Sequence, residues 1–182
     1  MKTGDPVKGR PFLFFLIITL IFSCAGPTPL KESRTFRIIP NVPFYPQEAY
    51  QCGPAALAGV LNHWGVQVSP ADIAAEIFSE KAKGTLDIDM VFYAEKKGLK
   101  AVQFRGNLDD LKRDIHSGNP LIVLVDYGFW VYEQNHFMVV VGCEKGGIIV
   151  NSGKEKHKFI PLDNFLKTWE RTKFWTLRIT PQ

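Results

Sequence analysis

The sequence predicts an α+β domain in which helices of the first half pack on an antiparallel sheet formed mainly by the second half. Segments that open with a helix cap and end at a glycine recur between residues 53 and 118. They are followed by Leu121–Asp126, a nearly unbroken apolar run typical of a strand buried on both faces. A Lys-Gly-Gly turn at 145–147 then indicates a hairpin. Helices first and antiparallel strands second are typical of the α+β class.

Each element follows from local chemistry. Pro54 suits the start of a helix, and the alanines after it are strong helix formers. Ser69, followed by a proline and Asp72, caps the second helix, and Asn107 caps the fourth. The expected helices are 53–63, 69–78, 87–98, 107–116 and 161–168. The expected strands are 99–104, 121–126, 137–143, 148–150 and 174–179, and 81–85 is expected to be a loop.

The N-terminus is expected to be a targeting segment. A basic stretch precedes the apolar run Phe12–Phe22, which has the length of a signal-peptide core and is short for a membrane span. Ser23-Cys24-Ala25 after it resembles the lipobox of bacterial lipoproteins, in which the cysteine becomes lipidated. We therefore expect a signal peptide at 1–23, a tether at 24–37 and a domain at 38–182. A plain signal peptide or an uncleaved anchor is the alternative.

Charge and cysteine usage exclude several classes of protein. The formal net charge of +4 falls to about +2 without the first 23 residues, which gives no electrostatic case for nucleic-acid binding. No cysteine and histidine cluster has the spacing of zinc ligands, so no metal or cofactor is expected. Three cysteines give no disulfide framework. Cys24 is the expected lipidation site, Cys52 is the candidate nucleophile, and Cys143 is left over.

Cys52 is the centre of the expected chemistry. It sits at a predicted helix start, where the positive end of the helix dipole favours a thiolate. Gly53 allows a tight turn and keeps the approach to the sulfur clear for substrate. Gln47, five residues upstream, has an amide that could donate to a developing oxyanion, with Gln51 as its competitor. The alternative is that Cys52 is a small buried hydrophobe, as free cysteines often are.

A cysteine nucleophile needs a base and a group that orients the base. His136 is the best candidate base, because it opens the apolar strand 137–143 where an ionisable ring would be out of place in a core. An antiparallel hairpin returns Asn151 to its side, where the amide oxygen could accept from the imidazole. A structural histidine, and a simple turn at 151–153, are the alternatives.

The connection between Asp126 and His136 is rich in aromatic residues. Trp130 and Tyr132 are expected to face the cleft and bind an extended peptide, while Glu133 could recognise a basic group or a free amine. The alternative is that Phe129 and Trp130 plug the core at the end of the sheet.

Taken together, these residues resemble the C39 branch of the papain-like cysteine peptidases. The resemblance rests on Gln-x4-Cys-Gly-Pro-Ala-Ala-Leu at 47–57 and on His-Phe-x-Val-Val-x-Gly at 136–142, and it covers most of 38–179. The preceding Val-Pro-Phe-Tyr-Pro is similar to lipoprotein members from Gram-negative bacteria. The resemblance implies a papain-like fold with Cys52 as nucleophile, His136 as base and Gln47 in the oxyanion hole. Many members have Asp-Pro where this chain has Asn151 and Ser152, and either residue could orient the histidine.

The resulting hypothesis is a lipid-anchored cysteine peptidase that acts through a thioester, with a peptide or protein substrate. The absence of an aspartate after Cys24 favours the periplasmic face of the outer membrane. The best-known branch cleaves leader peptides within an exporting transporter, and that substrate is not expected for an exported chain. The alternatives are a cell-wall peptide amidase or transpeptidase, and a peptide-binding module without turnover.

Overall fold

The computed structural model describes residues 1, 4, 37–47 and 50–182, and the helices and strands in these ranges belong to the unit Ser33–Gln182. Its main element is a seven-stranded antiparallel sheet in the order β4-β9-β5-β6-β7-β8, with β1 also paired to β6. The strands are β1 (Arg37–Ile38), β4 (Leu99–Arg105), β5 (Leu121–Asp126), β6 (Asn135–Glu144), β7 (Gly147–Ser152), β8 (Glu155–Pro161) and β9 (Trp175–Pro181). The predicted α+β class and the antiparallel sheet are confirmed.

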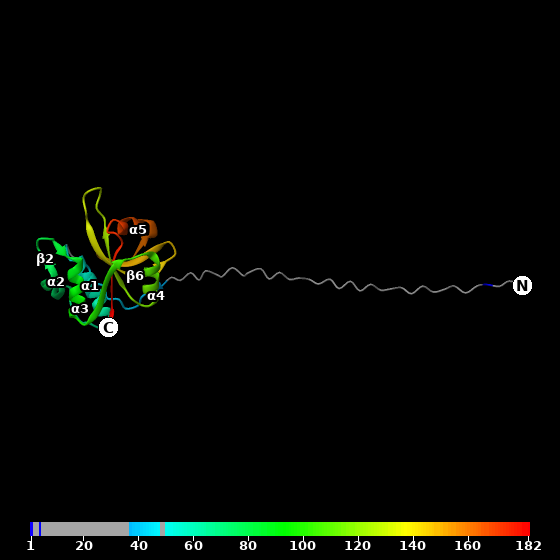
Figure 1. Cartoon of the computed structure of the whole chain (residues 1–182), viewed down its shortest axis with the longest axis horizontal. Coiled ribbons are helices and arrows are strands. Elements are labelled where there is room, and N and C mark those ends of the chain that lie inside the picture. The colour runs from blue at the N-terminus through cyan, green and yellow to red at the C-terminus, as the bar shows by residue number, and fades with distance from the viewer. Residues whose placement is uncertain (2–3, 5–36, 48–49) are drawn as a thin grey trace. The chain divides into compact units, whose positions relative to one another are not determined.

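Helices supply the rest of the core. They are α1 (Cys52–His63), α2 (Pro70–Ile77), α3 (Asp87–Lys96), α4 (Leu108–His116) and α5 (Leu162–Glu170). The first three pack against one another, next to a two-stranded sheet made of β2 (Phe78–Ser79) and β3 (Gly84–Thr85) (Figure 1). α1 also packs on β6, and every residue from Gly53 to Leu61 is buried. The N-terminal end of this buried helix is thereby fixed against the centre of the sheet.

The helix caps follow the sequence closely. Ser69 and Asp72 form a reciprocal capping box at α2, and Asn107 forms one with Asp110 at α4. α1 begins one residue earlier than expected, at Cys52, so Pro54 is its third residue rather than its first. A proline is still tolerated there because the first four N–H groups of a helix have no partner within it.

The sequence did not predict β1, β8 or the small sheet formed by β2 and β3. β8 is a lysine-rich edge strand whose side chains are mostly exposed, so no apolar pattern marks it, and charged residues are typical of exposed sheet edges. Within the segment 81–85, expected to be a loop, Gly84–Thr85 pairs with Phe78–Ser79. Two-residue strands carry too little pattern to be predicted.

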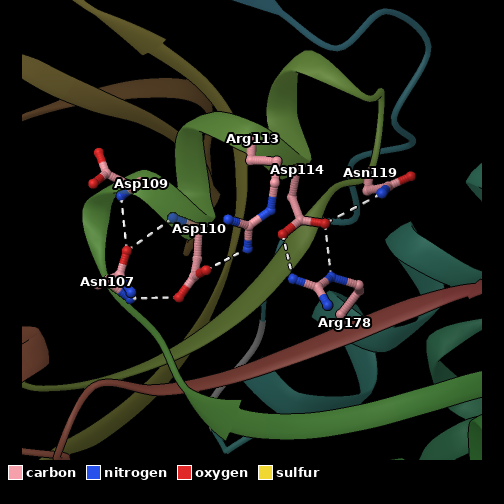
Figure 2. Close-up of polar contacts among 7 residues, drawn as sticks. All are labelled: Asn107, Asp109, Asp110, Arg113, Asp114, Asn119 and Arg178. Atoms are coloured by element: carbon pink, nitrogen blue, oxygen red, sulfur yellow. Dashed lines mark hydrogen bonds and ion pairs between the residues drawn. The ribbon is translucent and has the colours of Figure 1, made fainter.

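A buried ion pair ties α4 to the sheet. Asp114 is buried at the end of α4, and Arg178 of β9 donates to both of its carboxylate oxygens, over 2.7 and 2.5 Å (Figure 2). Asn119 donates to the same carboxylate, and the guanidinium of Arg178 lies 4.7 Å from the ring of Phe104. Burial of a carboxylate is costly unless it is paired and hydrogen-bonded, so this cluster fixes α4 against β9.

No helix in residues 37–47 and 50–182 is long and apolar enough to cross a membrane. The expected signal peptide at 1–23, Cys24 and nearly all of the tether at 24–37 lie outside the described residues. The predictions for that region therefore stay predictions.

Candidate active site

A cavity of about 730 Å³ opens where β5 and β7 end and where β6 begins. We call this edge the cleft end of the sheet. One wall is the segment 82–86, which includes β3, and the opposite wall is 132–137, the approach to β6 and its first residues. Gln47, Tyr50, Cys52 and Gly153 complete the lining. The cavity thus gathers the predicted nucleophile and oxyanion donor, which are near neighbours in the sequence, with the predicted base from a distant part of the chain.

Cys52 is the first residue of α1 and is half-buried, with Gln51 as the N-cap. Burial is the main influence and raises the pKa of its thiol, while the backbone N–H groups of Phe137 and Gly53 act in the opposite direction. The expectation that the helix start alone would favour a thiolate is wrong for the resting site, because desolvation outweighs the N–H groups. The sulfur is therefore a thiol until a base takes its proton.

His136 is the second residue of β6. Its Nε2 lies 2.9 Å from the hydroxyl oxygen of Ser152, and its ring lies 5.8 Å from that of Tyr127. Burial, with a smaller effect from the charge of Lys158, lowers the pKa of His136 to about 4. The imidazole is consequently neutral at pH 7. Ser152 engages Nε2, and Nδ1 has no hydrogen-bond partner within the described residues.

Ser152, and not Asn151, contacts the imidazole. β6 and β7 pair Val139 with Asn151, so these two side chains share one face of the sheet. Side chains alternate along a strand, which places His136, three positions before Val139, and Ser152 on the other face. Asn151 is buried and its Oδ1 accepts from the backbone N–H of His157. The assignment of Asn151 as the orienting residue is therefore corrected to the alternative, Ser152.

Gln47 is held against the turn that follows Ser152. The side-chain Oε1 of Gln47 accepts from the backbone N–H of Gly153 over 3.0 Å. The backbone N–H of Gln47 donates to the Gly153 carbonyl over 2.8 Å. Because the amide oxygen is engaged, the Nε2 group is the part of this side chain left for a ligand in the cavity that Gln47 lines. The competing Gln51 caps α1 through its carbonyl, which accepts from Ala55, and does not line the cavity.

Gly53 serves packing rather than substrate contact. A Cβ at this position would lie 2.8 Å from Cβ of Thr85, too close for any side chain, and Gly53 is not among the described residues that line the cavity. Its expected substrate-binding role is therefore corrected. The absence of a side chain lets β3 approach α1 and form the wall of the cleft. Thr85 lines that wall, and its buried hydroxyl oxygen has no hydrogen-bond partner within the described residues.

The aromatic connection 127–134 forms a hairpin that projects from the cleft end of the sheet (Figure 1, yellow-green). Tyr132 lines the cavity, as expected, and so does Glu133. Trp130 is exposed and is not part of the described cavity lining, so its expected substrate contact lies outside the cleft itself. The alternative that Phe129 and Trp130 plug the core is wrong, because both side chains are largely in solvent.

Sequence reasoning missed the group that holds this hairpin. Asp126 is buried and accepts from the backbone N–H groups of Gly128 and Gln134, and from the guanidinium of Arg171 at 2.7 Å. These donors help to keep the pKa of Asp126 below its usual range, against the opposing effect of burial. The signal was an aspartate that closes an apolar strand two residues before a glycine. A carboxylate at that point can accept from successive N–H groups of a turn.

The remaining ligand candidates are few. The described residues contain no group of three or more His, Cys, Asp or Glu side chains that could hold a metal ion. Cys143 is half-buried on β6, and burial raises the pKa of its thiol to about 11. Cys52 and Cys143 are both free thiols, and only Cys52 lines the cavity.

Comparison with known proteins identifies the family and the fold of the chain. The sequence model of the Peptidase_C39 like family matches residues 39–176. Among curated proteins, an uncharacterised protein of Methanothermobacter thermautotrophicus is 33% identical over 100 residues, covering 55% of this chain and 63% of that protein. A Methanothermobacter marburgensis protein is 35% identical over 99 residues, covering 54% and 62%. The chain thus spans less than two thirds of the length of these relatives.

Solved structures share the fold. A Bacillus anthracis protein assigned to the C39-like peptidases superposes with a TM-score of 0.67 at 16% identity, over 81% of this chain and 98% of that one. The peptidase domain of Streptococcus ComA, a bifunctional ABC transporter of a quorum-sensing pathway, gives 0.65 at 25% identity, over 78% and 99%. A double-glycine-motif protease from an AMS/PCAT transporter, solved with its leader peptide, gives 0.64 at 22% identity, over 81% and 99%.

Proposed function

Because the chain belongs to the Peptidase_C39 like family, we propose that it is a cysteine peptidase in which Cys52 attacks a peptide carbonyl. The observation that carries the proposal is the convergence of Cys52 and His136 on one cavity, with Ser152 hydrogen-bonded to the imidazole. A nucleophile, a base and an orienting group are the parts that covalent acyl transfer requires.

Acylation begins from the neutral pair. The Cys52 thiol gives its proton to the free nitrogen of His136, and the sulfur forms a bond to the carbonyl carbon while the carbonyl oxygen becomes an oxyanion. Gln47 Nε2 and the backbone N–H of Cys52, at the start of α1, stabilise that charge. The C–N bond then breaks, and the leaving amine takes the proton from His136. The product of this step is a thioester on Cys52.

Deacylation uses the same base. A water molecule gives a proton to His136 and attacks the thioester carbon, and the oxyanion forms again beside Gln47. Collapse of this intermediate breaks the C–S bond, and the sulfur recovers its proton from the imidazolium. Ser152 holds the ring through Nε2 in both steps, so the same nitrogen faces the reacting atoms throughout.

The substrate is an extended peptide. The cleft runs between the wall at 82–86 and the wall at 132–137, with the sulfur between them. A leader peptide is bound by the transporter protease whose fold this chain shares. For this chain we infer a peptide or protein outside the cytoplasm, because its N-terminus has the pattern of an export signal.

Active-site labelling tests the proposal. A cysteine-reactive epoxide should form one adduct on Cys52, located by peptide mass mapping, and none in Cys52→Ala. The Cys143→Ser variant is the matched control and should label like the wild type. Labelling that survives Cys52→Ala would refute the nucleophile, and no labelling with an intact fold would favour a peptide-binding module. Labelling together with hydrolysis of only cell-wall stem peptides would favour the amidase or transpeptidase alternative.

We further infer that Cys24 carries a lipid and that the protein sits on the periplasmic face of the outer membrane. The support is the Ser23-Cys24-Ala25 sequence after an apolar run. Metabolic incorporation of a fatty-acid probe should mark the wild type and not Cys24→Ser. Equal incorporation in both would refute lipidation, and a wild type that remains soluble in the periplasm would refute anchoring.

A further inference from the structure

The tip of the aromatic hairpin exposes four large apolar side chains in succession. Phe129, Trp130, Val131 and Tyr132 are 83%, 84%, 87% and 70% exposed. Single exposed apolar residues are common on soluble proteins, but contiguous apolar patches mark interaction sites. Of the four, only Tyr132 lines the cleft, so the other three are not accounted for by the active site.

The exposed tip has a defined conformation. Asp126 accepts from both ends of the hairpin, from Gly128 over 2.7 Å and from Gln134 over 2.8 Å. Higher up, the N–H of Tyr132 donates to the Phe129 carbonyl over 3.0 Å. A Cβ at Gly128 would lie 1.8 Å from the Tyr132 carbonyl oxygen, so the two arms touch there. These contacts close the turn that carries the apolar residues, and the hairpin projects from the sheet (Figure 1).

Unpaired cations surround the base of this hairpin. β7 and β8 are antiparallel to their neighbours, so the turn after Ser152, with Lys154, and the start of β8, with Lys156, lie at the cleft end of the sheet. The turn before β9, which contains Lys173, lies at the same end because β9 pairs antiparallel with β5. All three lysines are exposed, and none forms an ion pair within the described residues. Nearby Glu155 is paired with Lys158.

We propose that this hairpin docks the domain on an anionic phospholipid bilayer, with Phe129, Trp130 and Val131 inserted and the three lysines at the headgroups. Tryptophan, tyrosine and phenylalanine are the side chains that settle at a membrane interface. Lysines near the surface add attraction to anionic lipid. A projecting tip whose Phe129, Trp130 and Val131 side chains are largely in solvent suits insertion into a fluid phase better than it suits a bound peptide, which a groove would hold.

Docking in this way orients the active site. The arm of the hairpin that leads into β6 carries the cleft wall at 132–137, so a tip in the bilayer brings the cleft mouth to the headgroups. The cleft would then select polypeptides that lie at or emerge from the same surface. The docking itself does not depend on the proposed peptidase activity, and its test uses no substrate.

The experiment follows Trp130 as a depth reporter in the full chain mixed with vesicles of phosphatidylglycerol and phosphatidylcholine. Subtracting the emission spectrum of Trp130→Phe from that of the wild type removes the emission of the other three tryptophans. The apolar segment Phe12–Phe22 contains no tryptophan and does not contribute. Docking predicts a blue shift of this difference spectrum and quenching by lipids brominated on their acyl chains. Val131→Asp should abolish the quenching while leaving the far-UV circular dichroism unchanged.

The charge requirement has its own matched pair of variants. Lys154→Gln/Lys156→Gln should reduce the quenched fraction, since each lysine near the surface is worth about fivefold in binding. Lys100→Gln/Lys145→Gln, at the opposite end of the sheet, should behave like the wild type. Trp130 emission that ignores brominated lipid would overturn the proposal, as would a response only to added peptide. The preference for anionic lipid would be overturned if quenching were as strong with pure phosphatidylcholine vesicles as with the mixed vesicles, and if the two double lysine variants were quenched equally.

Discussion

Two regions meet at the cleft end of the sheet and differ in nearly every physical respect. The catalytic floor, made of Gln47, Cys52, His136 and Ser152, is buried or half-buried and is fixed by strand register and by the start of α1. The aromatic hairpin at 127–134 is exposed and is held at its base by Asp126. Reacting atoms need positions accurate to a fraction of an ångström, which packed elements provide. A binding surface needs exposure instead, which a projecting turn provides.

Among the predicted changes in the catalytic floor, removal of the oxyanion donor should lower kcat the most. Gln47→Ala should lower kcat by roughly a hundredfold with little change in KM, because the lost hydrogen bond forms only as charge develops on the carbonyl oxygen. Steady-state kinetics on a peptide substrate measures this. Gln51→Ala is the control and should stay near wild type, since that side chain does not line the cavity. The reverse pattern would move the oxyanion donor to Gln51.

The burial of His136 should make stability depend on pH. Its folded-state pKa of about 4 lies below the 6.5 of an exposed histidine, so between these values the unfolded chain binds more protons than the folded one. The contribution of His136 to the free energy of unfolding is therefore fully present above pH 6.5. It is lost as pH drops toward 4, by up to about 3 kcal/mol. Urea unfolding at pH 7 and pH 4.5 measures the fall, and His136→Gln should flatten it. An unchanged slope in that variant would assign the effect to other groups.

The two candidate orienting residues separate in a pair of variants. Ser152→Ala should lower kcat about tenfold and shift the acidic limb of the pH–rate profile, because the ring loses the group that fixes its tautomer. Asn151→Ala should leave kcat of the folded protein near wild type and act on stability, since Asn151 is buried and accepts from His157. A larger kcat loss in Asn151→Ala than in Ser152→Ala would restore the amide as the orienting group.

The sequence was sufficient for the elements with strong local signals. The capping residues Ser69 and Asn107, the apolar run of β5 and the start of α1 all have short-range causes, and the structure places them as expected to within one residue. The choice between Asn151 and Ser152 depends on which residues pair across β6 and β7, and one step of register exchanges the faces of the sheet. The pKa of Cys52 depends on burial by distant segments, which a helix start alone does not reveal.

The smallest expected effect comes from the hairpin, and it completes the contrast between the two regions. Trp130→Ala should change the free energy of unfolding by less than about 1 kcal/mol, since the side chain is in solvent. Trp169→Ala in α5, where the ring is fully buried, should cost about 3 kcal/mol or more. Chemical denaturation of both variants gives the comparison.

The same Trp130→Ala protein should cleave short soluble peptides with unchanged kcat/KM, while Tyr132→Ala, in the cleft wall, should raise KM severalfold. A raised KM in Trp130→Ala with soluble peptide would instead extend the substrate site to the hairpin tip, as the sequence first indicated. Docking on lipid would then be shared with, or replaced by, peptide binding, and the quenching measurement separates those two outcomes.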